Sequence, residues 1–411
     1  MLVYPLVVAV VAAVLHMSTA DPDEQAQRIA ALLQDRSKKE KEQCGSWAHD
    51  YAALHKDILS SAEPKLLVAV PHMSGLADRL IAASTALMVA ILTNRAFQVG
   101  QRHPLLSFEV AFDSPHIDWT RAVDPEWLMV GNYNSSVLAS KQYYAVNTIN
   151  NVPLQDLIVR QDLPTIMSDA VTTFMFGNRG KTISMFENTH YAPRLKGMGL
   201  TPHTAFGCLT NFMLVPKSSI FTPLAEQFLT MADLNPDILK ISIQIRVGDV
   251  TWSSPSSVED GSASLKHFHS FFACAKEIEE FAMAEGSYKS VLWYLATESM
   301  PLRRAAAEHY GSKLITSLGA TLEHSAKEGS VCTGDCKVSQ EGFTTAAAEW
   351  WMLGYAEYHV VSLNSGYGRS GAFRTLNKDR VYTVPHNNKP IKCTKNSATD
   401  LENIMYDWSG I

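Results

Sequence analysis

The sequence predicts an α/β protein whose parallel sheets are covered by helices. Apolar runs of strand length alternate with helical patterns in two stretches of the chain, residues 66–99 and 240–384. Hydrophobic residues make up 46% of the 411 residues and charged residues only 18%, so the chain can fill large cores. A length of this size predicts two or three domains.

Composition excludes several other classes of protein. The formal net charge is −6, from 35 Lys and Arg against 41 Asp and Glu, so the chain is not a globally basic nucleic-acid-binding protein. Its 22 Gly and 18 Pro are ordinary numbers, which excludes a collagenous or low-complexity chain. Nucleic acid is therefore not an expected partner.

The first twenty residues indicate the compartment. Residues 2–15 form an apolar run without charges, and small residues follow at Ser18-Thr19-Ala20, where a signal peptidase would cut. Residues 1–20 are interpreted as a secretory signal peptide, or alternatively as a short signal anchor that holds the chain on a membrane. Both interpretations place the body of the protein in the secretory lumen or outside the cell.

Six cysteines follow, an even number that predicts disulfides in an oxidising compartment. They are Cys44, Cys208, Cys274, Cys332, Cys336 and Cys393. The close pair Cys332 and Cys336 is interpreted as a loop staple, since no second Cys or His pair completes a zinc site. The sequon at Asn134 fits a luminal surface loop.

Four segments divide the chain. Residues 1–20 are the signal segment, and residues 21–63 are charged and helix-forming, which indicates a stem or an outer helix. An N-terminal α/β domain is assigned to residues 64–235 and a C-terminal one to 236–411, with the boundary at Asn235-Pro236. In the N-terminal domain we predict a strand at 66–70, a helix at 76–92 and a strand at 97–99, and we place few elements in the rest.

The C-terminal domain has a sharper pattern, in which each strand is separated from the next by a helix or a turn. This alternation predicts a parallel sheet. The predicted strands are 240–246, 291–296, 313–315, 359–363 and 380–384, and the predicted helices are 265–284, 302–308, 344–355 and 370–376.

Ligands of open α/β sheets bind at the carboxyl ends of the strands, so the loops that follow strands are the candidate sites. The first such loop is QIRVGD at 244–249, which places Arg246 at a strand end. Its guanidinium could hold a phosphate or pair with a nearby carboxylate, and the spacing alone favours neither.

The second loop contains Thr297 and Glu298. The Glu298 carboxylate could accept hydrogen bonds from a base edge or a sugar diol. Alternatively, the two residues cap the helix that follows, and from the sequence alone the cap is favoured.

The third loop is SLNSGYGRSG at 362–371, which follows a strand and opens a helix. The Ser365 hydroxyl and the first helical N–H groups would form an anion site. Residues 366–371 also spell G-x-G-x-x-G, but too few residues follow Gly371 for a dinucleotide-binding domain to start there.

Other chemistries have little support. The one Asp-x-Asp, at residues 21–23, is far from any predicted strand, and His267 and His269 do not share a helix face, so no metal is expected. A serine hydrolase is not indicated, because no G-x-S-x-G occurs. Trp350 and Trp351 are interpreted as core residues.

Four short motifs together resemble those of the GDP-fucose-dependent fucosyltransferase superfamily, which includes α1,6-, plant xyloglucan-type and protein O-fucosyltransferases. The segment 244–249 resembles their His-x-Arg-x-Gly-Asp, and LATE at 295–298 resembles their Leu-Ala-Thr-Asp. Residues 348–365 resemble their acidic helix, strand and Ser-rich turn, and GLADR at 75–79 resembles Gly-Leu-Gly-Asn-Arg. The resemblance covers about residues 66–100 and 240–376.

This resemblance implies two Rossmann-like domains facing a cleft, as in GT-B-like glycosyltransferases. It also implies inverting, metal-independent transfer of fucose from GDP-fucose, with no cofactor, to a glycan or glycoprotein hydroxyl, and with the N-terminal segment it implies a Golgi location or secretion. By position, Arg246 would hold the GDP phosphates, and Ser365 with the Gly366 amide would cap them. Glu298 would contact the nucleoside, and Glu349 would orient these groups.

The resemblance adds further candidates and shows departures. The other binding candidates are Gly75, Asp78, Arg79, Gln244, Thr297, Ser362 and Tyr367. Gln244 replaces the usual His, Val247 stands where some members have a second Arg, and residues 77–78 are Ala-Asp instead of Gly-Asn. Residues 254–255 are Ser-Pro where the α1,6 group has a catalytic Glu.

Asp249 and Glu259 are the remaining catalytic candidates, and Asp260 is a neighbouring carboxylate. The sequence does not assign the base among them. A catalytically weak GDP-sugar-binding or glycan-binding relative of the same fold is the alternative function, and a nicotinamide oxidoreductase is a more remote one.

Overall fold

The computed structural model describes residues 22–71, 74–100, 105–120, 143–147, 152–248, 265–323, 339–376, 378–385 and 391–400. Outside these described residues lie the signal segment, the sequon at Asn134, the pair Cys332 and Cys336, and the carboxylates Asp249, Glu259 and Asp260. In the part of the chain that is described, no helix combines the length and apolar character needed to cross a bilayer.

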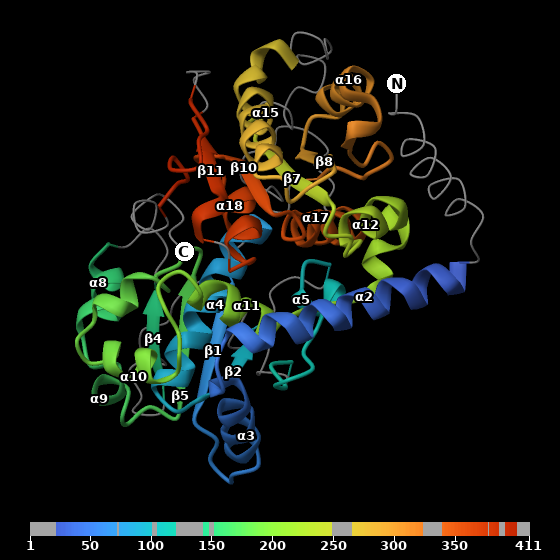
Figure 1. Ribbon diagram of the computed structural model, residues 1–411. Helices are drawn as coiled ribbons and strands as arrows, with labels where there is room; N and C mark the ends of the chain where they lie inside the picture. Colours follow the sequence, from blue (N-terminus) through green and yellow to red (C-terminus); the bar gives the residue numbers. More distant parts are fainter. Residues whose placement is uncertain are drawn as a thin grey trace.

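The N-terminal half is built on a parallel sheet of four strands in the order β2-β1-β5-β4 (Figure 1). They are β1 (Leu66–Pro71), β2 (Ala96–Val99), β4 (Tyr143–Asn147) and β5 (Thr172–Gly177). Helix α4 (Leu76–Leu92) joins β1 to β2 and is buried along almost its whole length. The β-α-β unit predicted from the apolar runs is confirmed.

The C-terminal half contains a second parallel sheet, in the order β11-β10-β7-β8-β9. Its strands are β7 (Ile238–Ile245), β8 (Ser290–Thr297), β9 (Leu314–Ile315), β10 (Tyr358–Ser362) and β11 (Val381–Val384). Its main helices are α15 (His269–Ala284), α16 (Met300–Tyr310), α17 (Gln340–Leu353) and α18 (Gly366–Phe373). The predicted parallel α/β architecture is thus present in both halves.

Two predicted helices begin four residues earlier than expected, because serine caps start them. The Ser339 hydroxyl accepts a hydrogen bond from the Gly342 amide at the start of α17, and the Ser365 hydroxyl accepts one from the Gly368 amide at the start of α18. A serine N-cap satisfies an otherwise unpaired amide, so the first turn can precede the apolar pattern.

The stretch between the two sheets holds short elements that the sequence pattern did not reveal. They are α5 (Phe108–Ala111), β3 (Phe112–Asp113), α8 (Val152–Arg160), α9 (Leu163–Ile166), η1 (Ser184–Glu187), α10 (Ala192–Gly197), α11 (Ala205–Met213), β6 (Val215–Pro216), η2 (Ser218–Leu224) and α12 (Ala225–Ala232). Most span fewer than three turns, so they carry little periodicity.

The N-terminal segment packs on the body as an outer helix. Helix α2 (Pro22–Gln43) buries Ile29 and Leu33 and lies against η2, α11 and α12 (Figure 1), and α3 (Trp47–Leu59) packs on β2. The disulfide Cys44–Cys208 joins this segment to α11, and Cys274–Cys393 joins α15 to the C-terminal segment. These two bridges confirm that the protein contains disulfides.

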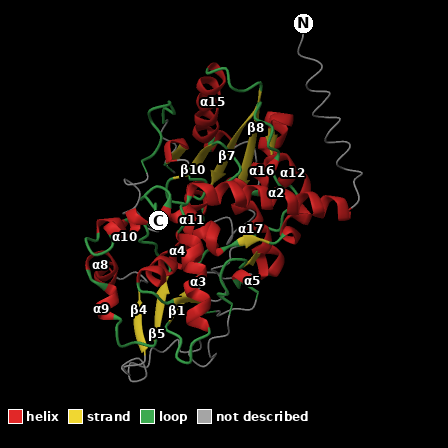
Figure 2. Cartoon of the chain, turned by 60° about the horizontal axis from the view of Figure 1, so that its bottom comes forward, coloured by secondary structure: helices red, strands yellow, loops and turns green. Residues whose placement is uncertain are grey.

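One hydrophobic core extends across the two halves. Helix α17 packs against α5, η2, α12 and α4, and α18 packs against α4, so helices lie between the two groups of strands (Figure 2). Trp350 and Trp351 are buried in this core, as predicted. Arg374 also crosses the boundary, because its Nη1 donates to Oδ1 of Asn211 (3.1 Å) and its Nη2 to the carbonyl of Trp351 (2.9 Å).

Candidate active site

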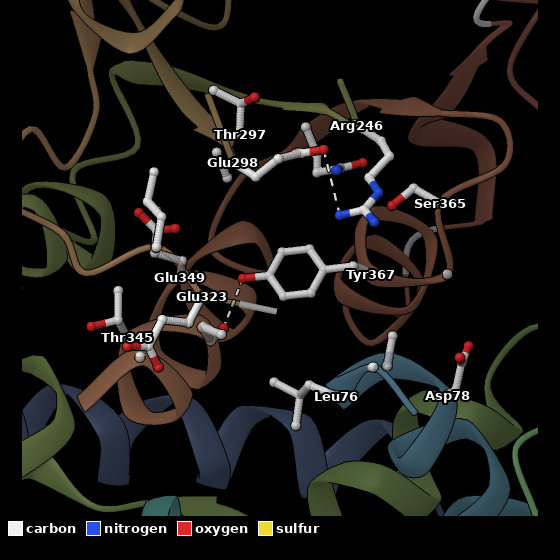
Figure 3. A pocket seen from close by; sticks show the side chains of 18 of the residues that line it. Leu76, Asp78, Arg246, Thr297, Glu298, Glu323, Thr345, Glu349, Ser365 and Tyr367 are labelled. Carbon is white, nitrogen blue, oxygen red and sulfur yellow. Dashed lines mark hydrogen bonds and ion pairs between the residues drawn. The ribbon is translucent and has the colours of Figure 1, made fainter. Parts of the chain in front are cut away.

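A cavity of about 450 Å³ lies between the two halves, at the carboxyl ends of the strands. Its walls come from the start of α4, from α17 and from the loops after β7, β8 and β10 (Figure 3). Ten of the residues predicted from the sequence line it: Gly75, Asp78, Gln244, Arg246, Thr297, Glu298, Glu349, Ser365, Gly366 and Tyr367. Arg79 and Ser362 are not among the lining residues.

Arg246 is the first residue after β7. Its backbone N–H donates to Oγ of Ser362 (2.8 Å). Ser362 therefore does not line the cavity itself but holds the loop after β7 against the end of β10. The guanidinium lies with Nη1 3.4 Å from Oε1 of Glu298 and extends beside Ser365 (Figure 3). The pairing of Arg246 with a carboxylate is therefore confirmed, and Arg246 also lines the cavity, where its contact with a phosphate stays a prediction.

Glu298 organises the loop after β7. Its Oε1 accepts the backbone N–H groups of Val247 (2.8 Å) and Gly248 (3.0 Å), in addition to the contact with Arg246. Gly248 has φ of +118°, a backbone conformation that glycine adopts without strain. The interpretation of Thr297 and Glu298 as a helix cap is wrong, because α16 is capped by Ser299, whose Oγ accepts from the Leu302 amide (3.3 Å).

Ser365 begins α18 and is itself buried, with its Oγ accepting the Gly368 N–H at 3.3 Å. Ser365, Gly366 and the positive end of the helix lie at the cavity wall, which suits an anion. Arg246 and Ser365 line the same cavity, as the phosphate-binding hypothesis requires.

The glycines of the G-x-G-x-x-G pattern serve close packing. A Cβ on Gly368 would collide with Oε1 of the buried Gln244 and lie 2.8 Å from its Cδ. A Cβ on Gly371 would lie 3.0 Å from Cδ1 of Leu353 and 3.2 Å from the carbonyl oxygen of Trp350. Glycines at 368 and 371 thus let α18 approach β7 and α17 closely.

Glu349 forms a buried, two-pronged ion pair with Arg303, a residue that the sequence analysis missed. Nη1 and Nη2 of Arg303 lie 2.5 and 2.8 Å from the two carboxylate oxygens, and Nε donates to the carbonyl of Thr297 (2.8 Å). Burial is the largest influence on the pKa of Arg303 and lowers it, but the charge and the hydrogen bonds of Glu349, together with the nearby tyrosines, raise the pKa overall. The pair therefore links α16, α17 and the end of β8 behind the cavity.

Tyr367 crosses the middle of the cavity (Figure 3). Its hydroxyl donates to the carbonyl of Ala346 (2.7 Å). Burial, helped by the nearby Glu349 charge, raises the pKa of Tyr367 well above its usual value, so the phenol stays neutral.

Asp78 lies on the opposite wall, in the first turn of α4. Burial raises the pKa of Asp78 to about 6, although the charges of Arg179 and Arg369 oppose this rise. Arg369 lies within the segment 362–371, whereas Arg179 lies outside all the sequence motifs. Arg79 lies elsewhere, since its Nη1 donates to the carbonyl of Leu106 (2.5 Å) and its guanidinium is 5.1 Å from the ring centre of Phe343.

The described residues contain no group of three or more His, Cys, Asp or Glu side chains arranged to hold a metal ion. The Arg246 guanidinium and the N–H groups at the start of α18 are groups that suit an anionic ligand.

No protein-family model and no curated protein matches the sequence. Among solved structures, the chain is similar to a mutant of the fucosyltransferase FUT1 from Arabidopsis thaliana in complex with GDP, with a TM-score of 0.52 and 15% identity over 86% of this chain and 77% of that one. Fucosyltransferase NodZ from Bradyrhizobium matches with a TM-score of 0.43 and 13% identity, over 75% of this chain and 92% of that one. POFUT1 in complex with GDP matches with a TM-score of 0.38 and 13% identity, over 79% and 99%.

The match to FUT1 shows the fold of this chain. It is a GT-B-type α/β fold, the class predicted from the four motifs.

Proposed function

We propose that the protein is an inverting, metal-independent glycosyltransferase that transfers fucose from GDP-fucose to a hydroxyl of a glycan or protein. The observation that carries this proposal is the meeting of Arg246, Ser365 and the start of α18 at one cavity wall. The shared fold with a GDP-bound fucosyltransferase supports guanosine diphosphate as the leaving group.

The reaction requires positive charge close to the bond of the sugar donor that breaks. As the bond between C1 and the phosphate oxygen lengthens, negative charge grows on the β-phosphate. The Arg246 guanidinium, the Ser365 hydroxyl and the N–H groups at the start of α18 would stabilise that charge without reorganising. Removal of one such donor typically costs about 3–4 kcal/mol of transition-state stabilisation.

We place the protein in the secretory pathway, with the Golgi lumen or secretion as its destination. The disulfides Cys44–Cys208 and Cys274–Cys393 support an oxidising compartment. A glycan or glycoprotein acceptor is the partner that such a compartment supplies, and residues 1–20 would provide the signal peptide or the anchor.

Ligand-induced thermal stabilisation tests the donor. GDP at millimolar concentration should raise the midpoint of thermal unfolding by several degrees, whereas UDP and NAD at the same concentration should not. Stabilisation by NAD alone would contradict the proposal and favour an oxidoreductase.

Turnover tests the reaction. GDP should be released from GDP-fucose in the presence of acceptor oligosaccharides, at the same rate with and without EDTA, and nuclear magnetic resonance should show an inverted anomeric centre in the product. Binding of GDP without any transfer would favour a catalytically weak GDP-sugar-binding protein. Two departures from the family favour this alternative: Val247 in place of a second Arg, and Ala77-Asp78 in place of Gly-Asn.

A further inference from the structure

Four carboxylates line the cavity, and three of them are already engaged. Glu298 accepts two backbone amides and contacts Arg246, and Glu349 holds Arg303. The carboxylate of Glu323 accepts the N–H (2.7 Å) and the hydroxyl (2.9 Å) of Ser339.

The fourth carboxylate is Asp78. Among the described residues it takes part in no hydrogen bond and no direct ion pair, so its oxygen lone pairs remain available to a ligand. The side chain rises from the first turn of α4 toward the side where Arg246 and Ser365 lie (Figure 3). A hydroxyl that enters from the N-terminal half would meet this carboxylate before it reached the diphosphate site.

Four arginines from different parts of the fold act on the charge of Asp78. They are Arg79 on its own helix, Arg179 after β5, Arg246 after β7 and Arg369 on α18, and each lowers the pKa of the carboxyl. Burial outweighs all four and leaves the pKa at about 6. Such a group is ionised at neutral pH and still takes a proton more readily than an exposed carboxylate, which suits a general base.

We propose that Asp78 is the general base of the transfer reaction, an inference that rests on the proposed function. In this step the acceptor O–H gives its proton to the Asp78 carboxylate, and the oxygen lone pair forms the new bond to C1 of fucose. The bond from C1 to the β-phosphate oxygen breaks at the same time, and its electron pair leaves with GDP toward Arg246. Inversion places base and leaving group on opposite faces of the sugar, which matches the opposite positions of Asp78 and Arg246.

The test compares Asp78→Asn and Asp78→Glu with wild-type enzyme, using GDP-fucose and a mixture of galactose- and N-acetylglucosamine-terminated oligosaccharides as acceptors. Asp50→Asn is the matched control, because Asp50 occupies the first turn of α3 and its side chain is 81% exposed. We expect Asp78→Asn to lose roughly 10²-fold or more in kcat above pH 7. Its affinity for GDP, measured by calorimetry, should stay within about threefold of wild type, since the diphosphate site is on the other wall.

The pH profile separates a base from a structural role. Wild-type kcat/KM should fall tenfold per pH unit below an apparent pKa near 6. The kcat/KM of Asp78→Asn should not change with pH in that range. Asp78→Glu should still lose activity at low pH, but with a different apparent pKa. Formate should restore part of the activity of Asp78→Asn.

Three outcomes would overturn the inference. They are an Asp78→Asn variant as active as wild type, an unchanged acid limb in that variant, or an equal loss of GDP binding and turnover. A wild-type protein that neither binds GDP nor releases it from GDP-fucose would refute the proposed function itself. The Asp50→Asn control should match wild type in every measurement.

Discussion

Glu298 and Arg246 meet at the carboxyl ends of two neighbouring strands, with 3.4 Å between Oε1 of Glu298 and Nη1 of Arg246. The same oxygen receives the amides of Val247 and Gly248, so one carboxylate fixes both the loop and the guanidinium. A positive group that is already positioned stabilises a developing charge better than a mobile one.

Substitutions of Glu298 should separate loop support from nucleoside contact. Glu298→Gln keeps an oxygen acceptor for the two amides, so GDP affinity should stay within about threefold. Glu298→Ala removes the acceptor, which costs about 1–3 kcal/mol and should weaken GDP binding by roughly tenfold or more. Calorimetry with GDP and ADP checks this, and a loss of discrimination between the two in Glu298→Gln would show instead that the carboxylate contacts the base.

Arg246→Ala should reduce kcat by roughly 10²-fold or more, because the leaving diphosphate loses its charged donor. GDP release from GDP-fucose in a coupled assay measures the effect. Arg160→Ala is the control, since Arg160 is an exposed residue of α8. Transfer at the wild-type rate by Arg246→Ala would refute the assignment.

The buried pair of Arg303 and Glu349 should dominate the stability of the cavity wall. Arg303→Met or Glu349→Leu alone leaves an uncompensated buried charge, and each should lower the free energy of unfolding by about 3–5 kcal/mol. The double variant should recover most of this loss, because both charges are gone. Urea denaturation at pH 7 measures the three variants, and a double variant as unstable as the sum of the single ones would contradict the expectation.

Gly368→Ala should destabilise the protein by about 1–3 kcal/mol, because the new methyl group would meet the buried side chain of Gln244. The second substitution Gln244→Ala should relieve the clash in the double variant. Gly319→Ala is the control, since no atom lies within 4 Å of a Cβ built there. Thermal unfolding checks all of these, and equal midpoints for Gly368→Ala and Gly319→Ala would contradict the packing argument.

Stability should depend on pH through Asp78. Its pKa is raised from the ordinary 3.8 to about 6 in the folded protein, so the folded state holds the proton more tightly than the unfolded one. The ionised carboxylate therefore destabilises the fold above pH 6 by up to roughly 3 kcal/mol, and this cost disappears as pH falls toward 3.8.

Asp78→Asn should consequently unfold at a higher temperature than wild type at pH 8, and the two midpoints should converge toward pH 4. Thermal unfolding across this range measures the difference. A constant difference at all pH values would show that Asp78 does not titrate in this window.

The predictable part of the fold was carried by continuous apolar runs. β1 is such a run, whereas β7 alternates apolar and polar residues. In the second sheet, parallel pairing of β7, β8 and β10 brings their carboxyl ends to one edge, which is why Arg246 and Ser365 could be expected to meet. The cap at the end of β8 was misjudged, since Ser299 competes locally with Thr297 for that position.

Residues that reach the cavity from elsewhere could not be predicted. Arg303 lies inside helix α16, and the one local sign of its role is that this charged residue falls on the buried face of the helix. Arg179 follows β5, and it approaches Asp78 because β5 pairs with β1 in the N-terminal sheet, a pairing that the sequence pattern did not reveal. Such contacts follow from tertiary structure, which a period of 2 or 3.6 does not encode.

In the chain, helix α17 lies between β9 and β10 of the C-terminal sheet. It packs, however, into the hydrophobic core that it shares with helices of the N-terminal half. If the two halves moved apart, the buried side chains of Trp350 and Trp351 would become exposed to water. Exposing two large aromatic side chains costs several kcal/mol. We therefore expect GDP to leave the proposed donor site without a movement of one half against the other. The distance between the two walls of the cavity should then be the same before and after each turnover.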